Sequence, residues 1–174
     1  MRRVAVIASA SGNGKTTVGR ALAQRLGVPF VELDALHWGP NWTEASAKEL
    51  RARVQPIVSS EAWVIDGVYR GKLGDLVLEN ADVVVWLDLP MRVWFPRLAR
   101  RTLRRAVRRE EFLNGNRETL RSALLSRDSL ILYAVRSHRR RRRLYPEQLT
   151  RFTVVRLRST AEVDDFLRNV ERAT

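Results

Sequence analysis

The 174-residue sequence contains no cysteine, only two histidines and only three lysines. Without thiols there are no disulfides, and two histidines are too few to suggest a zinc site. No apolar stretch approaches the roughly 20 residues that a helix needs to cross a bilayer. The opening "MRRVAVIASASG" is not typical of a secretory signal, because glycines and a lysine follow its short apolar run. We therefore expect one compact cytoplasmic domain with no membrane segment.

Positive charge is abundant but confined to one segment. The formal net charge is +13, and residues 92–143 hold 17 arginines against four acids. The rest of the chain carries 15 basic and 15 acidic residues and is neutral. A concentrated arginine segment suits phosphate groups, whether they belong to a nucleotide or to a polynucleotide.

Apolar runs typical of buried strands alternate with helical patterns along the chain. The expected strands are "RRVAVIAS", "PFVELD", "AWVIDG", "ADVVVWLDLP" and "RFTVVRL". Helices are expected over 15–27, ended by Gly27; over 43–60, with Thr43 as N-cap; and over 159–173, with Ser159 and Glu162 spaced as a capping box. This alternation predicts an α/β fold with a parallel sheet and right-handed crossovers.

The stretch "IASASGNGKTT", residues 7–17, joins the first expected strand to the first expected helix. A phosphate loop needs small residues there, so that successive backbone N–H groups can turn inward on a β-phosphate. It also needs a lysine for the β/γ-phosphate oxygens and a hydroxyl for Mg²⁺, roles that suit Lys15 and Thr16. The candidate ATP-binding residues are Ser11, Gly12, Asn13, Gly14, Lys15, Thr16 and Thr17.

Ser9 departs from this pattern, because it stands where the first glycine of a phosphate loop is usual. A serine fits there if its φ stays negative. The rival dinucleotide fingerprint fails, since a third glycine at the right spacing is missing. The plainer alternative is a glycine-rich turn followed by a surface lysine.

Two acids are expected beside this loop, at the carboxyl ends of strands. Asp66 in "WVIDGVYRG" is a candidate ligand of Mg²⁺ together with Thr16, and Arg70 is a candidate for gripping an anionic group of an acceptor. The alternative makes Asp66 a turn residue before Gly67. Asp88, in "LDLP", is a candidate second carboxylate on the metal side, but a helix cap at the end of the strand is the more usual role for such a residue.

Asp34 in "VELDALHWGPNW" follows the second expected strand and is a candidate for orienting or deprotonating an acceptor hydroxyl. His37, Trp38 and Trp42 offer an aromatic wall for the acceptor. For the tryptophans a core position is an equal alternative, and for His37 a hydrogen-bonded turn position is the more usual one.

These motifs resemble the small P-loop kinases of the adenylate, shikimate and gluconate kinase type. "SGNGKTT" is similar to their phosphate loop, and "IDGVYR" to an element of adenylate kinases that serves Mg²⁺ and the acceptor phosphate. "LDLP" followed by Arg97 and Arg101 resembles the start of their lid. Over nearly the whole chain the sequence is closer still to bacterial adenylate kinase-like ATPases known as FlaR-related DNA topology modulation proteins. It lacks the usual arginine-bearing element for a nucleotide acceptor.

The resemblance implies a P-loop NTPase fold, with a five-stranded sheet in the order 2-3-1-4-5. We expect residues 1–174 to form one kinase-like domain, with an arginine-rich helical lid over 92–143 between strands four and five. The expected activity is ATP- and Mg²⁺-dependent phosphoryl transfer to an unidentified small acceptor. Lys15, Asp34 and the lid arginines Arg97, Arg101 and Arg136 would be catalytic.

The alternative function is an ATP-binding regulator that contacts DNA or RNA through its arginine-rich segment. Five consecutive arginines, residues 139–143, exceed what one triphosphate occupies. A solvated helix end is the plainer reading of the same run.

Overall fold

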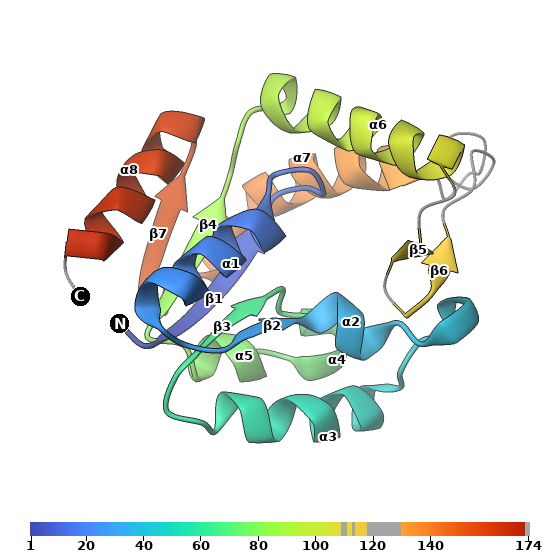
Figure 1. Cartoon of the computed structure of the whole chain (residues 1–174). Helices are drawn as coiled ribbons and strands as arrows, with labels where there is room; N and C mark the ends of the chain where they lie inside the picture. The colour runs from blue at the N-terminus through green and yellow to red at the C-terminus, as the bar shows by residue number, and fades with distance from the viewer. Residues whose placement is uncertain (109–110, 113, 118–129, 173–174) are drawn as a thin grey trace.

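The computed structural model describes residues 1–108, 111–112, 114–117 and 130–172. Its centre is a five-stranded, wholly parallel sheet in the order β2-β3-β1-β4-β7, which confirms the expected fold class (Figure 1). The strands are β1 (Arg3–Ala8), β2 (Phe30–Glu32), β3 (Trp63–Asp66), β4 (Val83–Leu87) and β7 (Val154–Leu157).

The register of the strands brings the chemistry-bearing segments to one edge of the sheet. Asp66, the last residue of β3, pairs with Glu32 of β2 on one side and with Val6 of β1 on the other. Ala8 and Leu87 pair where β1 and β4 end. The phosphate loop and the segments that carry Asp34, Asp66 and Asp88 therefore all leave the sheet at its carboxyl edge, where ligands of such sheets bind.

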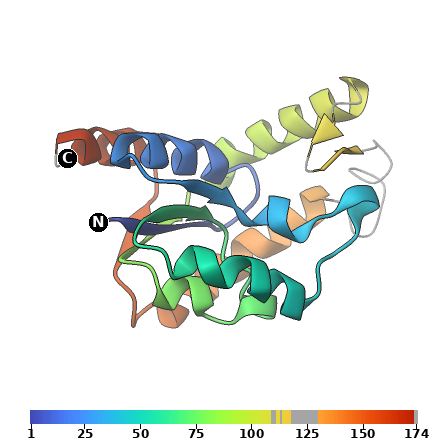
Figure 2. The same cartoon turned by 60° about the horizontal axis from the view of Figure 1, so that its bottom comes forward.

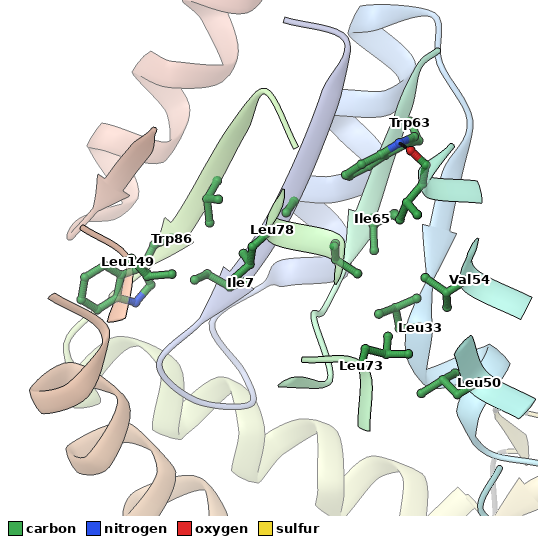
Figure 3. Close-up of a cluster of buried hydrophobic side chains, with 14 of the residues drawn as sticks. Ile7, Leu33, Leu50, Val54, Trp63, Ile65, Leu73, Leu78, Trp86 and Leu149 are labelled. Atoms are coloured by element: carbon green, nitrogen blue, oxygen red, sulfur yellow. Dashed lines mark hydrogen bonds between the residues drawn. The ribbon is translucent and has the colours of Figure 1, made fainter. Parts of the chain in front are cut away.

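Helices cover both faces of the sheet, so its central strands are apolar on both sides. One face packs against α1 (Lys15–Leu26) and α8 (Thr160–Arg172), which lie side by side in Figures 1 and 2. The opposite face packs against α3 (Ala47–Val58), α4 (Arg70–Leu73) and α5 (Leu76–Glu79). Figure 3 shows the core on this second face, where Ile7, Trp63 and Trp86 lie among leucines of the helices.

The helix ends test three sequence signals. Gly27 caps α1 with a φ of 63°, as expected of a glycine terminator. The expectation of Thr43 as N-cap of the next helix is wrong. Ser46 caps α3 and forms a capping box with Glu49, while the Thr43 hydroxyl donates to the Pro40 carbonyl in the preceding turn. Ser159 accepts from the Glu162 N–H at the start of α8, as expected.

The segment between β4 and β7 contains α6 (Met91–Arg108), a small hairpin of β5 (Glu111–Phe112) and β6 (Asn116–Arg117), and α7 (Leu130–Gln148). These elements occupy the place predicted for the lid at 92–143, although α7 continues past its expected end. Residues 109–110, 113 and 118–129 of that prediction lie outside the described residues. The role of this segment as a lid stays a prediction. No helix in the described part of the chain has the length and apolar character to cross a membrane.

Candidate functional site

The loop between β1 and α1, residues 9–14, has the backbone that a phosphate site requires. Gly12 and Gly14 have φ angles of 86° and 87°, in the left-handed region that favours glycine. A Cβ on Gly12 would lie 2.6 Å from the Trp94 carbonyl oxygen, so α6 packs directly on the loop. Gly14 is the N-cap of α1 and offers no side chain to its first amides. These amides are thus arranged to bind an anion.

The side chain of Asn13 is hydrogen-bonded within the protein. It donates to the Ala10 carbonyl at 2.9 Å and accepts from the Leu89 N–H at 3.0 Å. Asn13 is buried and ties the loop to the connection between β4 and α6. Its predicted part in ATP binding would therefore use its backbone N–H.

Lys15, Thr16 and Asp66 meet at the start of α1. Lys15 Nζ lies 2.6 Å from Asp66 Oδ1, and the Thr16 hydroxyl donates to Asp66 Oδ2 at 2.6 Å. Asp66 is 3% exposed, so Lys15 and Thr16, and not water, stabilise its carboxylate. The three residues predicted to act on phosphate and metal are thereby brought together.

Two of these residues, Thr16 and Asp66, fit a magnesium ion in chemical terms. A hydroxyl and a carboxylate supply the hard oxygen ligands that Mg²⁺ prefers, and it commonly takes its remaining ligands from substrate phosphates and water. Among the described residues no group of three or more histidines, cysteines or acids could hold a metal by itself.

Asp34 lies in α2 (Leu33–His37), the short helix that follows β2. The Tyr69 hydroxyl donates to Asp34 Oδ1 at 2.6 Å. Burial and then the Asp34 charge raise the pKa of Tyr69, so its phenol stays protonated and remains a donor. Tyr69 holds this position with a φ of 42°, which is unusual for a large side chain.

Glu32 is an acid that the sequence interpretation did not single out. It stands opposite Asp66 in the sheet register, two residues before Asp34. Burial, followed by the charges of Asp66 and Asp34, raises the pKa of Glu32, while Arg20 and Lys15 oppose the shift. The three acids therefore share one electrostatic environment. In the sequence, the signal for this shared environment is the pair of acids in "VELD", two residues apart at the end of a strand.

His37 and Trp38 lie in an aromatic cluster beside Asp34. The His37 ring centroid is 4.7 Å from that of Trp38 and 4.6 Å from that of Tyr69, and the Trp38 ring meets the Trp42 ring edge-on at 5.5 Å. Burial and the nearby Lys72 lower the pKa of His37. His37 is 3% exposed, whereas Trp42 in the short turn η1 (Pro40–Trp42) is 39% exposed. The cluster is thus only partly core.

The hairpin of β5 and β6 contacts this aromatic segment through two asparagines. Asn116 accepts from the Trp42 N–H at 2.8 Å and donates to the Gly39 carbonyl at 2.9 Å. Asn114 donates to the carbonyls of Ala35, at 3.2 Å, and Trp38, at 2.5 Å. Residues far apart in sequence therefore build this side of the site together, as Figure 1 shows from the position of the hairpin. No sequence signal indicated the pairing.

Arg70, the predicted acceptor-binding arginine, contacts Asp75 and α7 in this structure. Its Nε lies 2.6 Å from Asp75 Oδ1, and its guanidinium donates to Gln148 at 2.8 Å. Burial raises the pKa of Tyr145, and the charges of Arg141, Arg70 and Lys15 oppose the shift. Arg70 is paired with a carboxylate in this structure.

The predicted lid arginines lie on α6 and α7. Arg97 and Arg101 line a hollow of about 330 Å³ along α6 with Pro96, Arg100 and Arg104. Arg136 is exposed on α7. The arginines line one face of α6, because they are spaced three and four residues apart.

Two arginines of α7 that the sequence interpretation did not assign reach the end of β1 and Asp88, beside the phosphate loop. Arg141 donates to the carbonyl of Ala8 at 3.1 Å, and Arg142 Nε lies 3.1 Å from Asp88 Oδ1. Arg141 shares a helix face with buried Ala134, His138 and Tyr145. That spacing was present in the sequence and marks Arg141 as the inward-facing arginine of the run 139–143.

Together, the sheet order, the phosphate loop and the acid at the end of β3 define the P-loop kinase type of nucleotide-binding fold. Consistent with it, residues 5–70, from β1 to the start of α4, match the family described as ATPase family associated with various cellular activities (AAA).

Comparisons of sequence agree with this fold. The chain is 29% identical over 107 residues to the uncharacterized protein YqaC of Bacillus subtilis, covering 60% of each chain. It is 57% identical over 35 residues to the shikimate kinase of Ruegeria pomeroyi, covering 20% of this chain and 18% of that enzyme. The matches therefore span less than two thirds of the length of these relatives.

Solved structures of small kinases have the same fold. They include a shikimate kinase from Acinetobacter baumannii in complex with shikimate (TM-score 0.58, 19% identity, 99% of this chain and 93% of that one). A shikimate kinase from Bacteroides thetaiotaomicron follows (0.56, 18%, 99% and 97%). A gluconokinase from Sinorhizobium meliloti is also similar (0.52, 20%, 99% and 97%). The chain thus has the P-loop small-molecule kinase fold, as the resemblance implied. None of these comparisons supports the nucleic-acid alternative.

Proposed function

We propose that the protein transfers the γ-phosphoryl group of ATP to a hydroxyl group of a small molecule, in the cytoplasm. One observation carries the proposal: Lys15 and Thr16 contact the buried carboxylate of Asp66 at 2.6 Å, beside a loop in which Gly12 and Gly14 have φ angles in the left-handed region. These are the parts that hold a triphosphate and its metal in P-loop enzymes. The kinase fold supports the reaction class.

On the donor side, the loop amides and Lys15 would bind the β- and γ-phosphates of ATP. Lys15 and Thr16 would exchange their contacts with Asp66 for contacts with phosphate and metal. Bound there by Thr16, Asp66 and the phosphates, Mg²⁺ would neutralise charge that builds up on the transferred group. The negative charge of Asp66 is balanced by Lys15 in the nucleotide-free protein.

On the acceptor side, Asp34 would take the proton of the acceptor hydroxyl. The hydroxyl oxygen then forms a bond to the γ-phosphorus as the bond to the β–γ bridging oxygen breaks, and ADP leaves with that electron pair. Tyr69 donates to Asp34 Oδ1 and so orients the carboxylate, leaving Oδ2 for the acceptor. His37 and Trp38 would border the acceptor.

Arginines would neutralise the charge of the transferring group. Arg97, Arg101 and Arg136 remain candidates for this role, and Arg141 joins them because it already reaches the carbonyl of Ala8. Such arginine contacts contribute about 10³- to 10⁵-fold in rate in phosphoryl-transfer enzymes. Their closure over ATP would also exclude water from the site.

A hydroxyl acceptor is favoured over a nucleotide phosphate by the pairing of Arg70. In this structure Arg70 shares the Asp75 carboxylate with Arg151, and it would have to leave that carboxylate to bind an acceptor phosphate. Asp34 and its tyrosine offer a hydroxyl-activating pair instead. Kinases of shikimate and gluconate, whose folds are similar, act on hydroxy acids, which makes hydroxy acids and sugars the first compounds to test.

The test is an ATP-consumption screen with Mg²⁺ against hydroxy acids, sugars, nucleosides and nucleotides. We expect turnover with one hydroxyl-bearing class, and a loss of about 10²-fold or more in the Lys15→Met variant. Lys48→Met, at an exposed position of α3, is the matched control and should keep full activity. Full turnover and ATP affinity in Lys15→Met would contradict the proposal.

A further inference from the structure

Ser9, at the first position of the phosphate loop, is completely buried and uses its hydroxyl twice. The hydroxyl donates to Asp88 Oδ1 at 2.7 Å and accepts from the Trp86 indole N–H at 2.9 Å. Its backbone N–H donates to the Leu87 carbonyl at 3.1 Å. Ser9 is also absent from the residues with positive φ. Its conformation therefore does not require glycine, and its side chain makes two hydrogen bonds that a glycine could not make.

Asp88, the partner of Ser9, is a buried carboxylate held between three elements. Arg156 of β7 donates to Asp88 Oδ2 from two nitrogens, at 2.6 and 3.0 Å, and its guanidinium stacks over the Trp86 ring at 4.1 Å. Arg142 of α7 reaches Oδ1, the same oxygen that accepts from Ser9. One carboxylate thus meets two guanidinium groups, which leaves an excess of positive charge below a loop that would bind phosphate.

A second contact from α7 reaches the same point of the chain. Arg141 donates to the carbonyl of Ala8, the residue directly before Ser9. Consecutive arginines of α7 therefore hold both the end of β1 and the carboxylate that holds Ser9. Neither arginine needs to touch a ligand to influence the shape of the loop.

A glycine at position 9 would remove contacts without relieving any strain. The Trp86 indole N–H would lose the acceptor it has in this structure, and Asp88 Oδ1 would lose its hydrogen bond from Ser9 and keep the ion pair with Arg142. Buried polar groups that lose a partner are costly, because water cannot replace it. Glycine would also widen the range of backbone conformations open to the loop.

We propose that Ser9 and Asp88 are positioning residues for the phosphate loop, so that the serine is a requirement of this chain and a glycine there weakens nucleotide binding. Arg142 belongs to the same brace and links α7 to the loop. The inference rests on the proposed function, because it concerns how the same loop binds ATP. It goes beyond the sequence analysis, which required of Ser9 only that its φ stays negative.

The experiment is a titration of wild type and variants with Mg²⁺ and a fluorescent ATP analogue. We expect the Kd to rise about tenfold in Ser9→Gly and Ser9→Ala. Asp88→Asn should raise the Kd by a similar factor, and Ser9→Ala should add little in the Asp88→Asn background, since the two residues act through one contact. Arg142→Gln, which removes a half-exposed side chain, should raise it about threefold.

Asp82→Asn is the matched control for a loss of fold stability alone. Asp82 also joins an arginine and backbone amides, those of Arg2 and Arg3, but at the amino end of the sheet. It should lower the unfolding temperature and leave the Kd within about twofold. If Ser9→Gly does not fold, Arg142→Gln and its double variant with Ser9→Ala test the same brace.

The outcomes separate the two proposals. No binding of the ATP analogue by the wild-type protein would overturn the proposed function, and the brace with it. Binding by wild type and equal or tighter binding by Ser9→Gly would overturn the brace alone. A Kd that rises in Ser9→Gly but not in Asp82→Asn is the result that supports it.

Discussion

The proposed donor and acceptor sides of the site are built in different ways. On the donor side the loop, Lys15, Thr16 and Asp66 lie at the ends of two adjacent strands, and short contacts join them. On the acceptor side Asp34 depends on Tyr69, and the aromatic segment after it depends on asparagines of the hairpin. The donor side is therefore set by the sheet, whereas the acceptor side needs contacts from the hairpin between β4 and β7 in addition to the neighbouring ends of β2 and β3.

The difference indicates that the donor side would suit any nucleoside triphosphate, whereas the acceptor side would select one kind of molecule. A triphosphate presents the same groups to every protein that binds it, so one strand–loop–helix unit is sufficient. An acceptor must be distinguished from similar molecules, which requires contacts from several directions. Asn41 and Trp42 both have positive φ, at 55° and 57°, and both lie on the acceptor side. Strain of this kind is often found where a site is shaped for its ligand.

The largest expected effect comes from the acceptor side. Asp34→Asn should lower kcat by about 10³-fold, because the amide cannot accept the proton of the acceptor hydroxyl. Affinity for ATP should stay within about twofold, since no hydrogen bond or ion pair among the described residues joins Asp34 to the phosphate loop. Turnover with the acceptor from the screen and ATP-analogue binding measure the two quantities. Asp164→Asn on α8 is the exposed control. Equal losses of turnover and ATP binding would contradict the separation of the two sides.

Asp66→Asn tests the donor side. We expect turnover to fall about 10²-fold and the Mg²⁺ concentration at half-maximal activity to rise, because a neutral amide is a weaker ligand of the metal. The variant also leaves Lys15 beside a neutral group in the nucleotide-free protein. A Mg²⁺ titration of ATP turnover measures the effect. An unchanged Mg²⁺ dependence would show that Asp66 serves Lys15 and Thr16 but no metal.

Sequence patterns predicted the donor side far better than the acceptor side. Lys15, Thr16 and Asp66 follow strands that are easily recognised, and parallel strands bring their carboxyl ends together without further information. The capping box of Ser46 and Glu49 is also a local sequence pattern, although the predicted N-cap, Thr43, is wrong. These are local signals, because each depends on residues that lie only a few positions apart in the chain.

The acceptor side depended on facts that no local pattern contains. The contact of Tyr69 with Asp34 requires the left-handed backbone of Tyr69, an exception that propensities disfavour. Asn116 reaches Trp42 across 74 positions of the chain. Such contacts follow from the way the β4–β7 insertion folds back over α2, and they become visible only in three dimensions.

The hairpin contact offers a smaller test of the acceptor side. Asn116→Ala removes two bonds to the segment of Gly39 and Trp42, and amide hydrogen exchange at Trp42 should accelerate about tenfold. The KM for the acceptor should rise while ATP binding stays unchanged. Asn80→Ala, which removes one side-chain bond to the Leu76 carbonyl away from the cleft, is the control. An effect on ATP binding equal to that on the acceptor would remove the distinction between the sides.

The smallest expected effect concerns pH and involves the two histidines, His37 on the acceptor side and His138 on α7. Burial lowers the pKa of His37 and of His138, and the positive charges of Lys72 and Arg142 add to the respective shifts. In the unfolded chain both histidines take up a proton near pH 6.5, whereas in the folded protein they do so only at lower pH. The unfolded state therefore binds more protons in this range, and stability must fall as pH drops below about 6.5.

We expect the free energy of unfolding to be lower at pH 5.5 than at pH 7.5 by about 1 kcal/mol, as measured by urea denaturation. His37→Gln and His138→Gln should each remove part of this slope, and the double variant most of it. Glu32, whose pKa is raised, acts with the opposite sign at lower pH, because its folded form retains a proton. If the slope survives in the double variant, other groups carry it. If only His37→Gln flattens it, the proton-sensitive contact belongs to the acceptor side, and the two sides differ in their pH response as well as in their construction.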